Sequence, residues 1–273
     1  MPNNTNCLEH MKMRKLTTFF TALAVTLASS MALTSCGEDE DSPSYRRKQV
    51  DPAKVFTAGL PKGFDEWVIE YDTSGRVIRF DTKDKQNFDN TLTVEYPMEG
   101  KNGGYDVIIT DPVNWTFYIT LGENGFVDYC KQVYKDSLGD TGEGYDEWWF
   151  RYNSDGQMCW MKRTEGGNEV TDITYKDGDI IKVVQTSGDG IEDFTETINY
   201  GDNPIPNKCG AMFFDSCFSI DLDEMDVAYW AGLLGKATKH LPINEYHTWI
   251  FDDNGYAIAI GCSFNNYDHT MMW

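Results

Sequence analysis

The densest group of carboxylates in the sequence lies near the start of its one convincing helix. It comprises Asp215, Asp221, Asp223, Glu224 and Asp226. Carboxylate oxygens are good ligands for Ca²⁺, but these acids lack the spacing of a known calcium-binding loop. Most of them lie where the start of a helix favours capping groups and negative charge. We therefore expect them to cap a helix, and the sequence predicts no metal site.

Histidine and serine are the other residues that could carry catalysis. His240, His247 and His269 have neither HExxH nor another metal-ligand spacing, and no GxSxG motif occurs. A glycosidase needs two carboxylates that converge on one cleft, and with 44 acidic residues in the chain no particular pair stands out. We expect no catalytic residue, no cofactor and no enzyme activity. A hydrolase of envelope or dietary polymer is a distant alternative.

One cysteine has a clear chemical context. Three basic residues at positions 12, 14 and 15 precede an uncharged apolar stretch from Leu16 to Leu33, as in a secretory signal. The following Leu33-Thr34-Ser35-Cys36 resembles the lipobox of bacterial lipoproteins, in which the chain is cut before the cysteine and that cysteine is lipidated. We therefore expect a signal peptide over residues 1–35 and a lipid on Cys36. An ordinary signal peptide with a chance cysteine is the alternative.

The segment after Cys36 predicts a tether. Gly37 to Ser42 is an acidic run that resembles the signal sending some lipoproteins of Gram-negative anaerobes to the cell surface, although it could also be a plain solvated spacer. Residues 36–62 lack apolar periodicity and contain Pro43, Pro52 and Pro61, so we expect a lipidated linker followed by one folded domain over 63–273. The net charge of −21 disfavours nucleic acid and anionic lipid surfaces. The expected location is the outer membrane, at the cell surface, with the lipid anchor as the only membrane contact.

The remaining cysteines indicate no disulfide framework. Apart from Cys7, which lies in the expected signal peptide, they are five in number, so at least one has no partner among them, and no CxxC pattern occurs. Cys209 and Cys217 could pair across a loop, or they could remain small buried hydrophobic groups. The full set is Cys130, Cys159, Cys209, Cys217 and Cys262.

The elements that would position these residues are mostly strands. One sequence pattern recurs five times: a strand ends, a few polar residues with Asn-Gly, Asp-Gly or Ser-Gly follow, and a second strand begins. This pattern predicts tight antiparallel hairpins. Strand-like alternation, as in Trp115, Phe117 and Ile119, supports this. We expect a mainly β, antiparallel up-and-down meander of about 12–13 strands curled into a barrel-like sheet. The hairpins are expected at 71–77, 121–127, 152–158, 175–180 and 251–257.

A single helix is expected from Asp221 to Leu241, with Asp221 and Glu224 as a capping box and Gly235 as a stop. Its apolar residues occupy two faces, so the helix should be buried. The hollow of the curled sheet is its predicted place. The expected core residues are Met225, Tyr229, Trp230, Leu233 and Leu234.

The segment from Val227 to Pro242, with the following strand and the turn at Asp252 to Tyr256, resembles the C-terminal signature of a family of bacterial lipoprotein domains of unknown function with a porin-like β fold. The hairpin at 71–77 is similar to that family's hairpins. The resemblance implies a fold and an envelope location. It implies no activity and no catalytic residues.

Aromatic residues are the positive functional feature of the sequence, with eight Trp, 15 Tyr and 15 Phe. An exposed aromatic side chain on a rigid sheet can stack on a sugar ring or anchor a peptide. The adjacent Trp148 and Trp149 must point to opposite faces of one strand and are the candidate ligand contacts. We therefore expect a non-enzymatic domain that binds a glycan or a protein. The alternative is a structural or accessory lipoprotein that contacts another envelope protein.

Overall fold

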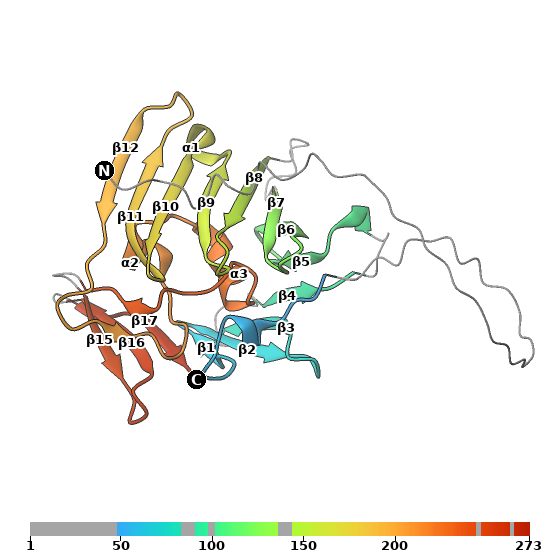
Figure 1. Ribbon diagram of the computed structural model, residues 1–273. Helices are drawn as coiled ribbons and strands as arrows, with labels where there is room; N and C mark the ends of the chain where they lie inside the picture. The colour runs from blue at the N-terminus through green and yellow to red at the C-terminus, as the bar shows by residue number, and fades with distance from the viewer. Residues whose placement is uncertain (1–47, 83–90, 98–101, 136–143, 244–246, 263–264) are drawn as a thin grey trace, which may run out of the picture. The chain divides into compact units, whose positions relative to one another are not determined.

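The structure is a computed structural model that describes residues 48–82, 91–97, 102–135, 144–243, 247–262 and 265–273 (Figure 1). The expected signal peptide and Cys36 lie outside these residues. Residues from Lys48 to Trp273 form one compact unit, so the expected linker boundary at residue 62 is wrong. Asp51 caps the short helix η2 (Pro52–Lys54), and this turn directs Val55 and Phe56 into the core. Three apolar side chains, including Val50, anchor a segment that lacks any regular periodicity.

Within the described ranges, fifteen strands form one antiparallel sheet, more than the twelve or thirteen expected. Strands β1 to β12 follow one another as a meander, and β17, β16 and β15 extend the sheet beyond β1. The pairing of β1 with β17 joins two ends of the chain that are far apart in sequence. The strands are β1 (Gly63–Phe64), β2 (Trp67–Tyr71), β3 (Val77–Thr82), β4 (Leu92–Glu95), β5 (Val107–Thr110), β6 (Trp115–Leu121), β7 (Val127–Tyr134), β8 (Tyr145–Tyr152), β9 (Met158–Arg163), β10 (Val170–Lys176), β11 (Asp179–Thr186), β12 (Glu192–Thr197), β15 (His247–Phe251), β16 (Ala257–Cys262) and β17 (Asn265–Met272).

The five predicted hairpins are confirmed, and four of them share one turn geometry. In the β8–β9 turn, Asn153 N–H donates to the Gln157 carbonyl and Gly156 N–H donates to the Asn153 carbonyl. Gly156 has φ +83°, a left-handed conformation that glycine adopts without a steric penalty. The register shifts by one residue after Arg151, which is the bulge expected of such hairpins. The turns at 71–77, 121–127 and 251–257 repeat this pattern.

A long insertion between β12 and β15 leaves the sheet and returns to it. Its two ends are joined by the two-stranded pair β13 (Ile205–Pro206) and β14 (His240–Leu241), and by a bridge between Asn199 and Ile243. We call the enclosed residues 207–239 the core insertion. It contains α2 (Phe214–Phe218), η4 (Asp223–Met225) and α3 (Asp226–Trp230), whereas α1 (Glu165–Asn168) and η3 (Asn102–Gly104) lie in turns of the sheet. No helix among the described residues is long and apolar enough to cross a membrane.

The single helix expected from Asp221 to Leu241 is wrong in extent. The helical part ends at Trp230, because Gly232 adopts φ +76° and reverses the chain. Leu233 N–H donates to the Ala228 carbonyl and Gly232 N–H donates to the Tyr229 carbonyl, the paired bonds of a Schellman motif. A side chain at Gly232 would also meet Pro52, whose Cα lies 2.6 Å from the ideal Cβ position.

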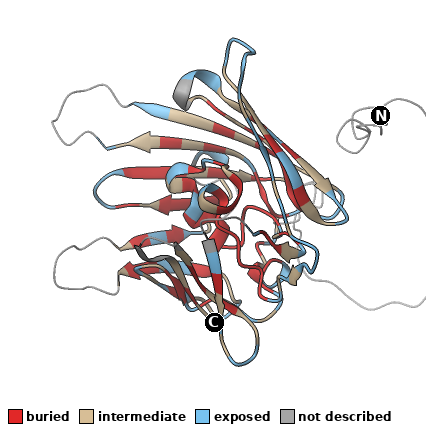
Figure 2. Cartoon of the chain, turned by 90° about the vertical axis from the view of Figure 1, so that its left-hand side faces the viewer, coloured by how far each residue is buried: buried red, intermediate tan, exposed pale blue. Residues whose placement is uncertain are grey.

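The core insertion supplies the centre of the hydrophobic core (Figure 2). Strand side chains such as Phe80, Phe117 and Phe150 are at most 1% exposed and belong to the same core as the insertion. The Trp230 ring stacks on Phe64 of β1 with ring centroids 4.7 Å apart. All five expected core residues of the insertion, from Met225 to Leu234, are at most 1% exposed. The inner face of the sheet is therefore covered, as the two apolar faces of the segment predict.

Candidate functional site

The outer face of β7, β8 and β9 carries a group of four aromatic rings, and a cation lies over three of them. Alternation along β8 explains its position: Trp148 and Phe150 point into the core and are at most 1% exposed, so Trp149 and Arg151 point outward. The rings lie on adjacent strands and are partly or fully exposed. We call this surface the outer aromatic patch. It comprises Tyr129, Tyr145, Trp149 and Trp160 with Lys131, Arg151 and Lys162.

Strand register brings the patch together. Trp149 of β8 lies between Tyr129 of β7 and Lys162 of β9. Its ring centroid is 5.7 Å from that of Tyr129, and the Lys162 Nζ lies 5.3 Å from it. Trp160 is the diagonal neighbour of Trp149 on β9, because it pairs with Arg151 two residues along β8. The two indole rings therefore stand on one continuous face.

Cations also lie over the rings of Trp160 and Tyr145. The Arg151 Cζ is 4.2 Å from the Trp160 ring centroid, and the Lys131 Nζ is 4.3 Å from that of Tyr145. Each such contact at an exposed site contributes about 0.5–1 kcal/mol. Tyr145 keeps 55% of its surface exposed. The patch thus combines π faces with flexible hydrogen-bond donors.

A hydrogen bond fixes the edge of the patch. The Tyr129 hydroxyl donates to Glu147 Oε1 at 2.7 Å. Burial, and then this bond to a carboxylate, raise the pKa of Tyr129 above its ordinary value. Tyr129 therefore stays neutral and keeps its ring in place. Stacking and hydrogen bonding are the chemistry that this surface offers.

Of the two predicted ligand contacts, only Trp149 is on the surface. Trp148 has no exposed surface, so its assignment as a ligand contact is wrong. Its Nε1 donates to Gln132 Oε1 at 3.4 Å, and the Arg163 Cζ lies 5.7 Å from its ring centroid. Gln132 and Arg163 are buried polar side chains whose groups satisfy the indole inside the core.

The acidic residues expected to cap the helix do different work. Asp221 Oδ1 accepts from the backbone N–H of Asp223 at 3.0 Å, but the N-cap residues of η4 and α3 are Leu222 and Met225, so the capping box is wrong. Asp221 Oδ2 accepts from Arg163 at 2.8 Å, and Glu224 Oε2 accepts from Gln132 at 3.0 Å. These bonds join the core insertion to β9 and β7. The carboxylates therefore hold the insertion against polar groups of the sheet.

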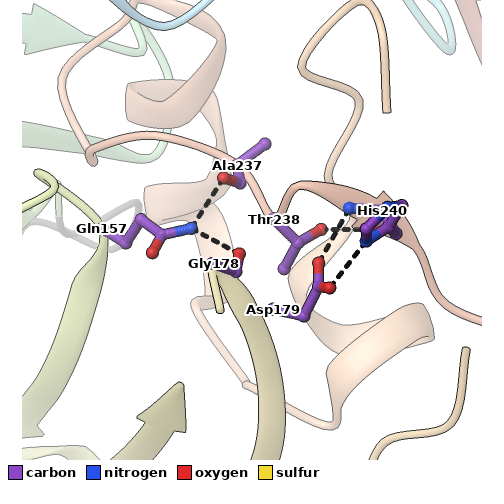
Figure 3. Close-up of polar contacts among 6 residues, drawn as sticks. All are labelled: Gln157, Gly178, Asp179, Ala237, Thr238 and His240. Carbon is purple, nitrogen blue, oxygen red and sulfur yellow. Dashed lines mark hydrogen bonds and ion pairs between the residues drawn. The ribbon is translucent and has the colours of Figure 1, made fainter. Parts of the chain in front are cut away.

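The insertion is also bound to the hairpin turns that it crosses (Figure 3). Gln157 Nε2 donates to the carbonyl oxygens of Gly178 and Ala237 at 2.8 and 3.0 Å. Asp179 accepts from the His240 backbone N–H at 2.8 Å and lies 2.7 Å from its Nδ1. His240 is therefore a structural group at the end of the insertion. The side chain of His247 lies outside the described residues, and the His269 ring contacts the side chains of Asp65 and Ser216.

The cysteines of the insertion do not pair with each other. Cys209 and Cys217 are buried thiols, so the pairing that the sequence left open is wrong. Burial raises the pKa of the Cys217 thiol to about 12. Both act as small apolar groups of the core. The side chain of Cys262 lies outside the described residues.

The fold places the chain in a class of antiparallel β meanders that wrap around an insertion of their own. The chain belongs to the family described as a domain of unknown function (DUF4595) with porin-like fold, which matches residues 69–266. A crystal structure of a porin-like protein from Bacteroides uniformis is similar, with a TM-score of 0.50 and 18% identity over 75% of this chain and 86% of that chain. At this identity the similarity concerns the fold alone.

A second structural match carries no argument. The TcdB2-TccC3-Cdc42 structure matches with a TM-score of 0.34 and 14% identity, over 74% of this chain and 10% of that chain. No curated protein matches the chain.

Proposed function

We propose that this protein is a lipid-anchored domain of the outer membrane, exposed at the cell surface, that binds a glycan through the outer aromatic patch. The observation that carries the proposal is the presence of two partly exposed indole rings, Trp149 and Trp160, on adjacent strands of a rigid sheet. Aromatic side chains at the surface bind the apolar faces of ligands, and their ring edges tolerate water.

The position of the core insertion supports a ligand on the outer face. The inner face of the sheet is filled by side chains such as Phe218, Tyr229 and Trp230, each at most 1% exposed. A sugar would therefore meet the sheet from outside. There, the aliphatic faces of its ring can stack on indole while its hydroxyl groups accept from lysine and arginine.

The cations over the rings do not prevent such stacking. Moving Lys162 off the Trp149 ring costs about 0.5–1 kcal/mol, which is small beside the contribution of a buried aromatic contact in a complex. The displaced ammonium stays within reach of the ligand because the lysine stem is flexible. Each cation thus protects a ring in the free protein and becomes a hydrogen-bond donor in the complex.

A glycan array probed with the purified protein tests the proposal. We expect binding to at least one glycan class, and loss of that signal in Trp149→Ala. Phe251→Ala is the matched control, because Phe251 is a 36% exposed aromatic on β15, away from the patch. Equal signals for Trp149→Ala and the wild type would contradict the proposed site.

A silent array would favour the alternative role of an accessory envelope lipoprotein. In that case, a defined envelope protein should co-purify from detergent extracts with the wild type and not with Trp149→Ala. If the envelope protein co-purifies equally with the wild type and with Trp149→Ala, the outer aromatic patch binds neither a glycan nor this partner.

The location has its own test, which concerns Cys36. We expect the wild type to incorporate an alkyne-labelled fatty acid and Cys36→Ser to lose the label. Protease treatment of intact cells should degrade the domain, because surface display exposes it. A domain that survives this treatment while a known surface protein is cut would contradict surface exposure.

A further inference from the structure

Three side chains from distant parts of the chain form an ordered acid, base and hydroxyl relay. Asp65 lies in the turn between β1 and β2, His269 in β17 and Ser216 in the middle of α2. Asp65 Oδ2 lies 2.9 Å from His269 Nδ1. On the other side of the ring, His269 Nε2 lies 2.7 Å from Ser216 Oγ. Both distances are those of normal hydrogen bonds.

The backbone holds the carboxylate in a fixed orientation. Asp65 N–H donates to the Thr270 carbonyl, and Thr270 N–H donates to Asp65 Oδ1, both at 2.8 Å. Asp65 has φ +44°, a sparsely populated conformation that this pair of bonds maintains. The second carboxylate oxygen is thereby directed at the His269 ring.

This arrangement fixes the tautomer of the neutral imidazole. A carboxylate only accepts, so His269 Nδ1 carries the proton and donates it to Asp65. The Nε2 lone pair then accepts from the Ser216 hydroxyl. The Phe213 ring, 4.3 Å from the imidazole and inclined by 12°, holds the plane of the base. This order of groups is the one that activates a serine nucleophile, and it is recognised by geometry and not by sequence position.

The relay is accessible from solvent. The side chains of His269 and Asp65 are 27% and 25% exposed, and Ser216 is partly exposed. Asp226 of α3 lies close enough to interact electrostatically with both Asp65 and His269. A small reagent can therefore reach the Ser216 hydroxyl, whose proton can pass to His269 Nε2.

We propose that Ser216 is a nucleophile that accepts acyl groups from small esters, with His269 as its general base and Asp65 as a positioning residue. Ser216 Oγ bonds to the ester carbonyl carbon while its proton passes to His269 Nε2. The bond between the carbonyl carbon and the alcohol oxygen then breaks, and the alcohol leaves with that proton. Water then attacks the acyl carbon and passes a proton to His269 Nε2. The bond from that carbon to Ser216 Oγ breaks, the serine takes the proton back from His269, and a carboxylic acid leaves. This activity is independent of glycan binding by the outer aromatic patch.

A fluorophosphonate, which reacts with activated serines, provides the direct test on the folded full-length protein. We expect one adduct by intact mass, located on Ser216 by peptide mapping, together with hydrolysis of p-nitrophenyl acetate. The peptide map of the wild type decides the question even if a variant fails to fold. Failure to label the folded protein, or labelling at another serine, would overturn the proposal.

Variants separate activation from a structural role. His269→Gln should slow labelling by about 100-fold or more, since general base catalysis contributes roughly that much. Asp65→Asn should preserve the bond from Thr270 but donate to His269 Nδ1, which moves the ring proton to Nε2 and blocks the base. Ser154→Ala, in the exposed β8–β9 turn, is the matched control and should label like the wild type. Asp65→Asn that melts and labels like the wild type would contradict the positioning role.

Discussion

Replacing Trp230 by alanine removes the side chain on which the core insertion and two distant segments converge. The ring is 1% exposed. It stacks on Phe64 at 4.7 Å and on Phe56 at 5.9 Å, with interplanar angles of 9° and 5°. Phe213 lies 5.6 Å away at a tilt. The side chain therefore joins the start of the sheet, the segment before it and the insertion.

The expected cost follows from these contacts. Truncation of a buried Trp to Ala costs about 3–5 kcal/mol through lost transfer free energy and the cavity left behind. The three aromatic neighbours place Trp230 at the upper end, because each aromatic pair adds about 0.5–1.5 kcal/mol beyond area burial. For a domain of this size, each kcal/mol lowers Tm by roughly 2–4 °C. We expect Trp230→Ala to lower Tm by about 10–20 °C, and Trp230→Asp to prevent folding because it buries a charge.

Thermal unfolding followed by circular dichroism, with urea titration as a second measure, tests this expectation. The matched control is Trp160→Ala, which removes the same side chain from the outer face and should cost about 1 kcal/mol or less. Trp230→Ala that melts within about 2 °C of the wild type would refute the argument. It would show that the core insertion does not pack as a structural centre.

Three further outcomes follow from the geometry of the insertion. Gly235→Ala should destabilise the domain by at least ~1 kcal/mol more than Gly190→Ala in urea titration. Both residues have positive φ, but an added Cβ at Gly235 would lie 2.7 Å from the Gly156 carbonyl oxygen, whereas one at Gly190 meets nothing within 4 Å. Equal losses of stability in the two variants would contradict this close approach. Arg163→Ala should cost about 2 kcal/mol by the same assay, because a guanidinium that is 8% exposed loses charge-assisted hydrogen bonds to Glu169 and Asp221, whose side chains are 16% and 53% exposed. A loss below about 0.5 kcal/mol would contradict that role. Cys217 should resist iodoacetamide at pH 8 in the folded protein and react in urea, because burial raises the pKa of its thiol to about 12. Rapid alkylation of Cys217 in the folded protein, detected by peptide mass, would contradict its burial.

The hairpins could be predicted because their determinants are local. Asn-Gly and Asp-Gly specify a turn within a few residues, and the two flanking strands then pair without reference to the rest of the chain. The number of strands could not be predicted as well. β1 has only two residues, and its partner β17 lies at the other end of the sequence. Such a strand has no alternation of its own to reveal it.

The helix shows a different limit of sequence reasoning. Burial of the apolar residues between Met225 and Leu234 could be predicted from composition, but a buried helix and a buried irregular segment have the same apolar content. Tertiary hydrogen bonds decide between them here. Val127 N–H donates to the Leu233 carbonyl, and Lys236 N–H donates to the Gly156 carbonyl. Backbone groups of the insertion that would bond within a longer helix therefore form hydrogen bonds with the sheet instead.

The candidate site was visible only in part. Alternation along β8 places Trp148 and Trp149 on opposite faces, but it does not reveal which face is buried. Polar core partners, Gln132 and Arg163, allow Trp148 to be the inner residue. The clustering of Trp149 with Trp160 depends on cross-strand register, which becomes known only when the hairpin bulge is counted.

The relay of Asp65, Ser216 and His269 gave no signal in the sequence. Asp65 and His269 are 204 positions apart, and no short motif surrounds the serine. Their meeting depends on the pairing of β1 with β17 and on the return of the insertion to that edge. A histidine that looks isolated along the chain can therefore have two partners in the fold.

The most direct test of the proposed function is isothermal titration of the array-positive glycan into the wild type and the Trp149→Ala, Trp160→Ala double variant. Loss of two stacking rings should remove at least about 2 kcal/mol of binding free energy, which weakens Kd by roughly 30-fold. A single cooperative melting transition of the double variant, well above the temperature of the titration, would show that the domain is intact. A double variant that binds the glycan with the affinity of the wild type would contradict a binding role for the outer aromatic patch.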